Sequence, residues 1–509
     1  MGFTDLKNPK SVQGADSVYI DGPSTGFGEI RIATITPQGQ GDFVYGVSDR
    51  IFTTSSFAGG TVSAVSGVCE LSSGTDAQGS ATVQLRRGLK YRAGQASLMR
   101  ITALYDTPDA GNAQFVGAGN AECGYFLGYF GTSFGILHSQ TGQREVRTYT
   151  VTTGAATADL TVTLDGDAIT VPVTGGSDTS QTAYQLSLAD YSQVGRGGWL
   201  ADVVGSTVYF ISARSSSEFT GSYSIAGSTI VGTFDRFKAG ENQTNTFIPS
   251  SSFNIDKLDG TGPSQMTIDP SKGNVFEIAF QYLGFGNAFF CIEDPETGKF
   301  AGFHNVKNAN SRTIPVLKNP NVSVLATSAN IGGTNSVTMK TVSMGGFIEG
   351  GVVALDPKFS KTFNFASINS TTYKPLALLK SNRIYNGESS FGEIDILRLS
   401  GANNANNASF IIGLFLGPEI TGDVNYQYVD STNSIVSYAE LSLSTNTIGN
   451  LASLDPFYEF VVGPESSRMD DLTDLKIGIG VGRTILIAVK SVGNVNVASS
   501  ATINWFEQQ

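Results

Sequence analysis

The chain has 509 residues, with 32 basic and 44 acidic side chains and a net charge of −12 at pH 7. An acidic chain repels phosphate backbones, so nucleic acid is excluded as a main partner. The 60 glycines follow no Gly-X-Y period, which excludes a collagen-like fibre, and the three cysteines are too few and too scattered for a disulfide framework.

Residues 1–25 are predicted to form an N-terminal extended arm, because they are polar and contain two prolines and three glycines. They lack the apolar stretch of a secretory signal, and no run of 18 apolar residues occurs that would span a membrane. We therefore expect no membrane span. We also expect Cys69, Cys123 and Cys291 to be reduced, buried thiols.

Residues 26–145 are predicted to form the first part of a β-sandwich. The segment GEIRIATITP (28–37) alternates isoleucine with polar residues, and SLMRITALYD (97–106) is a further strand candidate. Clusters of Gly, Asp, Asn and Pro separate such segments at a spacing of about ten residues, which is typical of sandwiches and barrels.

Residues 146–240 differ in character and are predicted to form an inserted α+β module of β-β-α-β-β order. The segments DLTVTL and DAITVPVTG flank Asp165–Gly166, which is a turn signal for a hairpin. Strand patterns lead directly into and out of the module without a Pro-rich linker. We therefore expect an insertion into the surrounding sandwich.

One helix is predicted inside this module. Asp178 is the expected N-cap, and Gln181 occupies the capping-box position three residues later. Tyr184, Leu188 and Tyr191 follow at the spacing of one helical face. We expect these three side chains to face the core.

Residues 241–355 are predicted to form the second part of the β-sandwich, and residues 356–509 a C-terminal β-sandwich. Their apolar segments include NVFEIAFQYL, ASFIIGLFLG and RTILIAVKSVG. The predicted fold class is mainly all-β, with multiple jelly-roll-like β-sandwich domains and one small inserted α+β module. Because long β-rich proteins cover their sheet edges by association, we expect a symmetric oligomer, with a trimer or a pentamer favoured.

One segment, GTSFG (131–135), matches the nucleophile motif of serine hydrolases. That motif requires a strand before it and a helix after it, whereas the flanking YFLGYF and ILHSQTG predict strand-turn-strand. His138 and His304 are the two histidines of the chain, so a His-rich metal site is not expected. A glycine-rich hairpin is the favoured interpretation.

Two groups of carboxylates could supply the acid and the nucleophile of a glycan hydrolase: Asp165 with Asp167, and Asp470 and Asp471 with Asp474. A turn explains the first group, and capping within a polar loop explains the second. Neither group has EF-hand spacing, although a weak Ca²⁺ site stays open. We expect no catalytic residues, no cofactor and no metal site, with carboxylate-based hydrolysis as the residual alternative.

The chain also carries one cluster of basic residues: Arg86, Arg87, Lys90, Arg92 and Arg100. Such a cluster would suit an anionic glycan or a partner chain. Alternating solvent-facing strand positions are the favoured interpretation.

Four sequons for N-linked glycosylation occur, at Asn242, Asn321, Asn369 and Asn407. In a chain this rich in Asn, Ser and Thr, a few arise by chance. Whether any of them carries sugar is left open.

Several longer segments carry a family likeness, among them LKYRAGQASLMRITALYD, GNVFEIAFQYLGFGNAFFCIEDPETGKFAGFHNV and SATINWFEQQ. They resemble virion structural proteins, of the tail-fibre or spike type, from tailed phages and large algal double-stranded DNA viruses. The module at 146–240 is similar to modules repeated in phage tail proteins. The resemblance implies β-sandwich folds, symmetric assembly and display on a particle surface or vertex, and it supplies no catalytic residues.

We therefore expect a non-enzymatic virion protein, a surface spike, fibre, or vertex or capsid-associated component assembled in the host cytoplasm. Other virion or capsid proteins are its expected partners, and host cell-surface glycan is a further candidate. The alternative is a glycan-binding or glycan-depolymerising module, in which aromatic side chains such as Trp199 and Trp505 would stack on sugars. The virus, the host and the receptor stay open.

Overall fold

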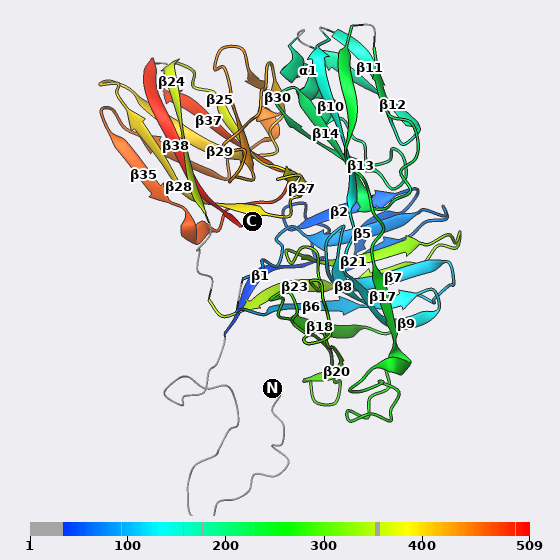
Figure 1. The fold of residues 1–509 in the computed structure, drawn as a ribbon. Coiled ribbons are helices and arrows are strands. Elements are labelled where there is room, and N and C mark those ends of the chain that lie inside the picture. Colours follow the sequence, from blue (N-terminus) through cyan, green and yellow to red (C-terminus); the bar gives the residue numbers. More distant parts are fainter. Residues whose placement is uncertain are drawn as a thin grey trace, which may run out of the picture.

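The computed structural model describes residues 34–92, 94–155, 157–174, 178–227, 229–351, 357–493 and 495–508. The predicted arm, residues 1–25, lies outside them. The described chain is mainly β, with several antiparallel sheets and one α-helix, which confirms the predicted fold class. Figure 1 shows three groups of sheets, which we call the N-terminal, inserted and C-terminal units.

The N-terminal unit contains the first nine strands and the strands from β17 to β23. These are β1 (Ile35–Asp42), β2 (Phe52–Phe57), β3 (Thr61–Val65), β4 (Val68–Ser72), β5 (Ser80–Leu85), β6 (Ser97–Ala103), β7 (Asn112–Gly119), β8 (Gly124–Phe130), β9 (Ser133–Ser139), β17 (Asn245–Pro249), β18 (Asn274–Phe280), β19 (Ala288–Glu293), β20 (Phe300–Val306), β21 (Ser323–Asn330), β22 (Thr338–Thr341) and β23 (Ser343–Glu349). A 3₁₀ turn, η1 (Ser250–Ser252), follows β17.

Two large sheets make this unit a sandwich. One has the strand order β1-β23-β6-β18-β19-β20, the other has the order β17-β9-β8-β7-β21-β5-β2, and a small sheet β22-β4-β3 completes the unit. Alternate residues of both large sheets, such as Ile101 and Ile278 of the first and Val116 and Leu127 of the second, form one buried core. The opposite face of each strand is left for solvent or for a neighbouring unit.

The inserted unit follows β9 and precedes β17. It consists of β10 (Arg144–Thr153), β11 (Thr157–Leu164), β12 (Asp167–Thr174), α1 (Thr179–Leu188), β13 (Trp199–Val204), β14 (Thr207–Ser215), β15 (Ser224–Ala226) and β16 (Val231–Lys238). The sheets have the orders β13-β14-β10-β16 and β12-β11-β15. Strands β9 and β17 pair antiparallel, with Ser139 opposite Asn245, so the chain leaves and re-enters the N-terminal unit at neighbouring positions.

Helix α1 begins where the sequence predicts, and of the three side chains expected to face the core, Tyr184 in the helix and Tyr191 beyond its end are buried. Asp178 is the N-cap and accepts hydrogen bonds from the amides of Ser180 and Gln181, at 2.8 and 3.1 Å. Gln181 closes no capping box, because its side-chain oxygen accepts from the amide of Val424 in the C-terminal unit, at 3.0 Å. The prediction for Leu188 is wrong, since this side chain is 62 % exposed in the last turn.

The C-terminal unit begins at Lys358. Its strands are β24 (Lys358–Ile368), β25 (Lys374–Ser381), β26 (Ile384–Tyr385), β27 (Glu388–Ser389), β28 (Glu393–Asn403), β29 (Ser409–Leu416), β30 (Ile420–Thr421), β31 (Gln427–Tyr428), β32 (Val436–Glu440), β33 (Thr447–Ile448), β34 (Tyr458–Val462), β35 (Ser467–Asp471), β36 (Gly478–Ile479), β37 (Thr484–Val492) and β38 (Val497–Gln508), with 3₁₀ turns η2 (Leu451–Ser453) and η3 (Thr473–Leu475). Sheets β24-β38-β28-β35 and β31-β32-β25-β37-β29-β34 enclose its core.

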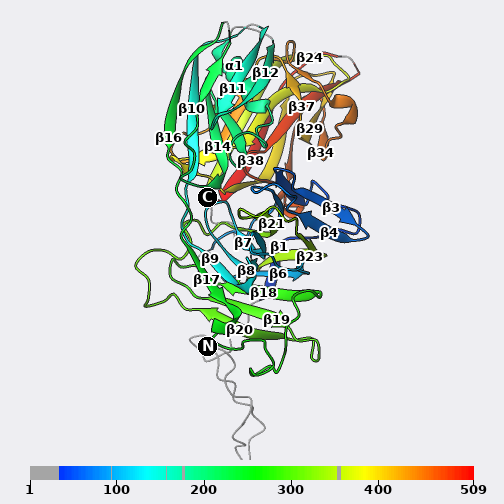
Figure 2. The ribbon, with the colours of Figure 1, turned by 90° about the vertical axis from the view of Figure 1, so that its right-hand side faces the viewer.

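The three units pack closely on one another. The inserted and C-terminal units lie side by side above the N-terminal unit, and the end of β38 lies near the place where the three meet (Figures 1 and 2). The inserted and C-terminal units share one apolar cluster, in which Tyr184 contacts Tyr426 with ring centroids 6.1 Å apart. A buried ion pair, Lys90–Glu393 at 3.3 Å, joins the N-terminal and C-terminal units.

Candidate functional site

The hydrolase-like segment 131–135 forms the turn of a hairpin. It connects β8 to β9, and Gly131 adopts a positive φ of 59° at the turn. A strand follows Ser133 instead of the helix that a nucleophile elbow requires. The predicted strand-turn-strand is therefore confirmed, and this segment does not form a nucleophile elbow.

Both histidines serve the fold. His138 is fully buried, stacks on Tyr125 with ring centroids 4.5 Å apart, and its Nε2 lies 2.7 Å from the carbonyl of Val316. Burial lowers the pKa of His138 to about 4. His304 accepts a hydrogen bond from the amide of Asn254 at 3.1 Å, and burial lowers the pKa of His304 as well.

The first carboxylate group holds turns in place. Asp165 and Gly166 adopt φ values of 52° and 92° between β11 and β12, as the predicted hairpin requires. Asp165 accepts from the amide of Gly221 at 2.8 Å, and Asp167 accepts from the amide of Gly195 at 3.1 Å. Both carboxylates therefore bind backbone.

The second group lies partly in a strand, so the predicted polar loop is wrong for Asp470 and Asp471, which belong to β35. Asp470 contacts the hydroxyl of Tyr458 and pairs with Arg468 at 2.9 Å; the Arg468 hydrogen bond lowers the pKa of Asp470. Asp471 accepts from the amide of Thr473 at 3.0 Å, and Asp474 lies exposed in η3. The carboxylates of Asp470 and Asp471 are therefore engaged by side-chain and backbone partners within the chain.

Metal binding and membrane crossing find no support among the described residues. No group of three or more His, Cys, Asp or Glu side chains in the described ranges is arranged to hold a metal ion. None of the helices within those ranges has the length and apolar content to cross a bilayer. Among the sequons, Asn242, Asn369 and Asn407 are exposed, whereas Asn321 is buried and accepts from the amide of Tyr91 at 3.2 Å.

Two members of the basic cluster, Arg87 and Lys90, form contacts between units, which corrects the prediction of solvent-facing positions for them. Arg87 pairs with Asp395 at 3.3 Å, and the Lys90 side chain, paired with Glu393, is 4 % exposed. Both acidic partners belong to the C-terminal unit, about 300 residues further along the chain. Arg100 is the member that lies on an open sheet face.

The two tryptophans do not form a sugar-binding surface. Trp199 is buried against Phe219, with ring centroids 5.2 Å apart. Trp505 is buried in the C-terminal core, and its indole N–H donates to Glu507 at 2.9 Å. Both rings stabilise cores, so any aromatic contact with a ligand comes from other residues.

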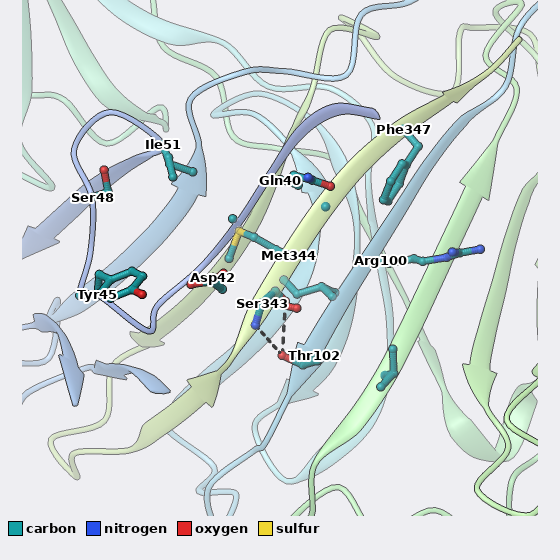
Figure 3. Close-up of a pocket in the computed structure, with 15 residues that line it drawn as sticks. Gln40, Asp42, Tyr45, Ser48, Ile51, Arg100, Thr102, Ser343, Met344 and Phe347 are labelled. Atoms are coloured by element: carbon teal, nitrogen blue, oxygen red, sulfur yellow. Dashed lines mark hydrogen bonds between the residues drawn. The ribbon is translucent and has the colours of Figure 1, made fainter. Parts of the chain in front are cut away.

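A groove of about 640 Å³ lies on the outer face of the six-stranded sheet of the N-terminal unit, over β1, β23 and β6 (Figure 3). The loop after β1, with Tyr45, Ser48 and Ile51, forms one side. Arg100 and Phe347 lie toward the other side (Figure 3). The inner face of the same sheet packs on the seven-stranded sheet, so the strands give the groove a rigid floor.

Strand register places the polar side chains of the floor in rows. Gln40 on β1 lies opposite Gly345 on β23, which lies opposite Arg100 on β6. One row along, Asp42 lies opposite Ser343. The hydroxyl of Thr102 accepts from the amide of Ser343 at 3.0 Å and ties this end of β23 to β6 (Figure 3).

Phe347 and Arg100 form a fixed aromatic and cationic edge. A Cβ at Gly345 would lie 3.0 Å from the Phe347 ring, so glycine leaves the space that the ring occupies. The Arg100 guanidinium lies 5.8 Å from the centroid of the Phe347 ring and 5.0 Å from that of Phe300. Its Nε donates to Glu277 at 2.8 Å. The remaining N–H donors of this half-exposed side chain can bind a ligand.

The opposite side is a loop with an exposed aromatic ring. Asp42 accepts a hydrogen bond from the amide of Val44 at 3.1 Å, and Gly46 completes the turn with a φ of 91°. This turn presents Tyr45 with a fully exposed side chain and Val44 with 62 % exposure. Of the two, Tyr45 lines the groove, so its ring is open to a ligand bound there.

The groove offers both polar and aromatic contacts. Asp42 and Gln40 can accept hydrogen bonds from hydroxyl groups, Arg100 can donate, and Tyr45 and Phe347 offer ring faces. Of the lining residues, the sequence analysis named Arg100 alone, because those outside its own strand come from segments that lie about 50 to 250 residues away. The strand candidate SLMRITALYD carries a local signal that could have added Thr102, because alternate residues of a strand lie on one face.

Comparisons with known proteins add little. No family model matches the sequence, and no curated protein matches it. Among solved structures, the potassium-bound Emp46p carbohydrate recognition domain aligns with 63 % of this chain and 97 % of its own, at 10 % identity and a TM-score of 0.21. The triple-jelly-roll turret protein of an archaeal virus aligns with 94 % and 97 %, at 8 % identity and a TM-score of 0.14. The Faustovirus major capsid protein aligns with 94 % and 90 %, at 6 % identity and a TM-score of 0.08. Scores this low carry no argument on function.

Proposed function

We propose that the chain is a non-enzymatic protein of a virus-particle surface that binds host-cell glycan in the groove over β1, β23 and β6. The observation that carries the binding role is the combination of exposed polar groups and aromatic faces on a rigid outer sheet. The virion location rests on the sequence resemblance. Three β-rich units joined by shared cores and buried ion pairs suit such a structural role.

The charges in the groove favour a neutral sugar. Glu277 pairs with Arg100 and offsets its charge, while Asp42 adds a negative charge at the floor. An anionic sugar would meet this carboxylate at short range, which is unfavourable. Hydroxyl groups of a neutral hexose can donate to Asp42 and Gln40, and the C–H face of the ring can pack on Phe347 or Tyr45.

A glycan array probed with the full chain tests the binding role. The wild-type protein should bind a subset of neutral glycans, and Tyr45→Ala should weaken this binding several-fold without changing stability, because Tyr45 contributes no buried area. Phe130→Ala, which removes a ring 47 % exposed outside the groove, is the matched control. Absence of any bound glycan, or equal loss in both variants, would refute the groove as the site.

Two further measurements separate the alternatives. Incubation with host-wall polysaccharide should release no reducing sugar, whereas steady release would replace this proposal by a depolymerase. Mass spectrometry of washed virus particles should detect the chain. Its recovery from infected-cell lysate alone would refute the virion location.

A further inference from the structure

A second, smaller cavity of about 180 Å³ lies between the inserted unit and the C-terminal unit. Four aromatic side chains line it, Tyr209, Phe237, Tyr385 and Tyr428, and its other lining residues are uncharged. Cavities between domains are common places for small ligands. This cavity and the glycan groove lie on different units, so a ligand bound here would be independent of glycan binding in the groove.

The inserted unit supplies two perpendicular walls. Tyr209 on β14 and Phe237 on β16 flank the central strand β10 of the four-stranded sheet. Their ring centroids lie 5.7 Å apart, and their planes make an angle of 88°. Phe237 is 46 % exposed, so its ring is available to a ligand.

The C-terminal unit supplies the other walls. Tyr385 lies in the β26–β27 hairpin, whose turn residues Asn386 and Gly387 have φ values of 48° and 78°. This conformation is the usual two-residue hairpin turn. The Tyr385 hydroxyl donates to the carbonyl of Thr432 at 2.9 Å, which fixes the ring. Burial and contact with the Tyr209 hydroxyl raise the pKa of Tyr428, so this phenol stays neutral.

Contacts between the units hold these walls together. Ile384 is buried against Val146 and Ile211, with Tyr209 packed on the same cluster. The ammonium of Lys238 donates to the carbonyl of Gly387 at 3.3 Å and pairs with Glu388. The cation beside the cavity is therefore neutralised by a carboxylate, and the aromatic walls keep their positions without a ligand.

The chemistry of these walls selects a particular kind of group. Aromatic rings around a cavity with no charged lining residue attract cations that carry no N–H groups, because the ring faces supply electron density and no hydrogen-bond acceptors are required. The polar lining residues beside the rings are Asn386 and Ser431, and the Tyr385 hydroxyl already donates to Thr432. A primary ammonium or a sugar would therefore find fewer hydrogen-bond partners here than in water, whereas a quaternary ammonium requires none. The net charge of −12 favours a cationic ligand as well.

We propose that the cavity formed by Tyr209, Phe237, Tyr385 and Tyr428 binds a quaternary ammonium group, such as the trimethylammonium of choline. The methyl groups contact the ring faces, and the positive charge is stabilised by all four rings. The hydroxyl end of choline points toward the open side of the cavity, where solvent satisfies it.

Isothermal titration of the full chain with choline and with 3,3-dimethyl-1-butanol tests this directly, because the two molecules have the same shape and differ in charge. Choline should bind about tenfold more tightly than the neutral alcohol. Equal affinity for the two, or no choline binding at millimolar concentration, would overturn the proposal. Tighter binding of glucose than of choline would overturn it too.

A substitution in the lining tests whether choline binds in this cavity. Phe237→Leu retains an apolar side chain and removes one ring, so choline affinity should fall several-fold while binding of the neutral alcohol stays unchanged. Phe130→Leu removes a ring of similar exposure on the N-terminal unit and should change neither. If Phe237→Leu weakens the binding of choline and of the neutral alcohol equally, the cavity recognises shape alone, and the proposed quaternary-ammonium site is refuted.

Discussion

The ammonium group of Lys380 on β25 contacts the carboxylate of Asp202 on β13, and the two side chains are only 7 % and 5 % exposed. Lys380 also donates to the carbonyl of Val203 at 2.6 Å, and Asp202 accepts from the amide of Arg383 at 2.7 Å. The pair lies where the inserted and C-terminal units meet. Each charge is therefore buried by the other unit, and the contact depends on both.

Lys380→Met should destabilise the protein by about 3–5 kcal/mol, because it leaves the Asp202 carboxylate buried without its partner charge. The urea concentration at the unfolding midpoint, followed by tryptophan fluorescence, measures the loss of stability. The control is Lys490→Met, which removes a partly buried partner 3.9 Å from the exposed carboxylate of Glu459 and should cost less than about 1 kcal/mol. Similar midpoints for the two variants would contradict the buried pair.

Stability should depend on His138 between pH 4 and 6.5. Its folded pKa is about 4 and its ordinary pKa is 6.5, so in this window the unfolded chain binds more protons. The His138 contribution is therefore fully present above pH 6.5 and is lost as the pH falls toward 4, by about 3 kcal/mol in total. In His138→Gln this part of the pH dependence should disappear from urea midpoints at pH 4.5 and 7.5. An unchanged pH dependence would show that His138 titrates normally.

The three thiols should be unreactive in the folded protein. All three are free; Cys69 and Cys123 are buried as predicted, whereas Cys291 is only partly buried. Burial raises the pKa values of Cys69, Cys123 and Cys291 to about 12, 11 and 12. Since the thiolate is the reactive form, iodoacetamide at pH 8 should label the native protein slowly and all three cysteines rapidly in urea. Fast native labelling, read by mass spectrometry, would contradict the reduced and buried state expected from the sequence.

Gly345→Ala should weaken glycan binding while the fold is retained. The added methyl would lie 3.0 Å from the Phe347 ring and would push it away from its position above the sheet. The affinity measured with a glycan selected on the array should fall several-fold. Gly351→Ala, where nothing lies within 4 Å of the new methyl, is the control. Unchanged affinity in Gly345→Ala would exclude Phe347 from the binding surface.

The assembly state can be measured by size-exclusion chromatography with light scattering. From the chain mass of 53.6 kDa, a trimer would have three times that mass, about 161 kDa, and a pentamer five times, about 268 kDa. One of these masses is expected for a spike, fibre or vertex protein. A stable monomer would contradict the predicted symmetric oligomer.

Local signals predicted well where local chemistry decides the conformation. Asp165–Gly166 predicted the hairpin turn and Asp178 predicted the N-cap of α1, because φ preferences and side-chain caps act within a few residues. The expected helix face is correct at Tyr184 and wrong at Leu188, because the burial of a helix face depends on which elements pack against it. In this fold the neighbouring elements cover Ala183, Tyr184 and Leu186 and leave Leu188 exposed.

Long-range contacts explain the remaining errors. Lys90 appeared solvent-facing because its partner, Glu393, follows about 300 residues later in the sequence. The groove was not predicted from the sequence for the same reason. Asp42, Arg100 and Phe347 come together only after three separate strands have paired. A periodic pattern identifies an outward-facing side chain, but it does not tell which surface will cover that side chain.

The pairing of Ser139 with Asn245 has an evolutionary consequence. Opposed residues on antiparallel strands lie only about 5 Å apart. The chain therefore enters and leaves the inserted unit at two neighbouring backbone positions. A genetic exchange at these two positions could replace the whole segment between Ser139 and Asn245 without changing the path of the chain in the N-terminal sandwich. Such an exchange would remove Asp202, Tyr209 and Phe237 together. A replacement segment would thus have to supply its own carboxylate for Lys380, which limits the segments that can be inserted there.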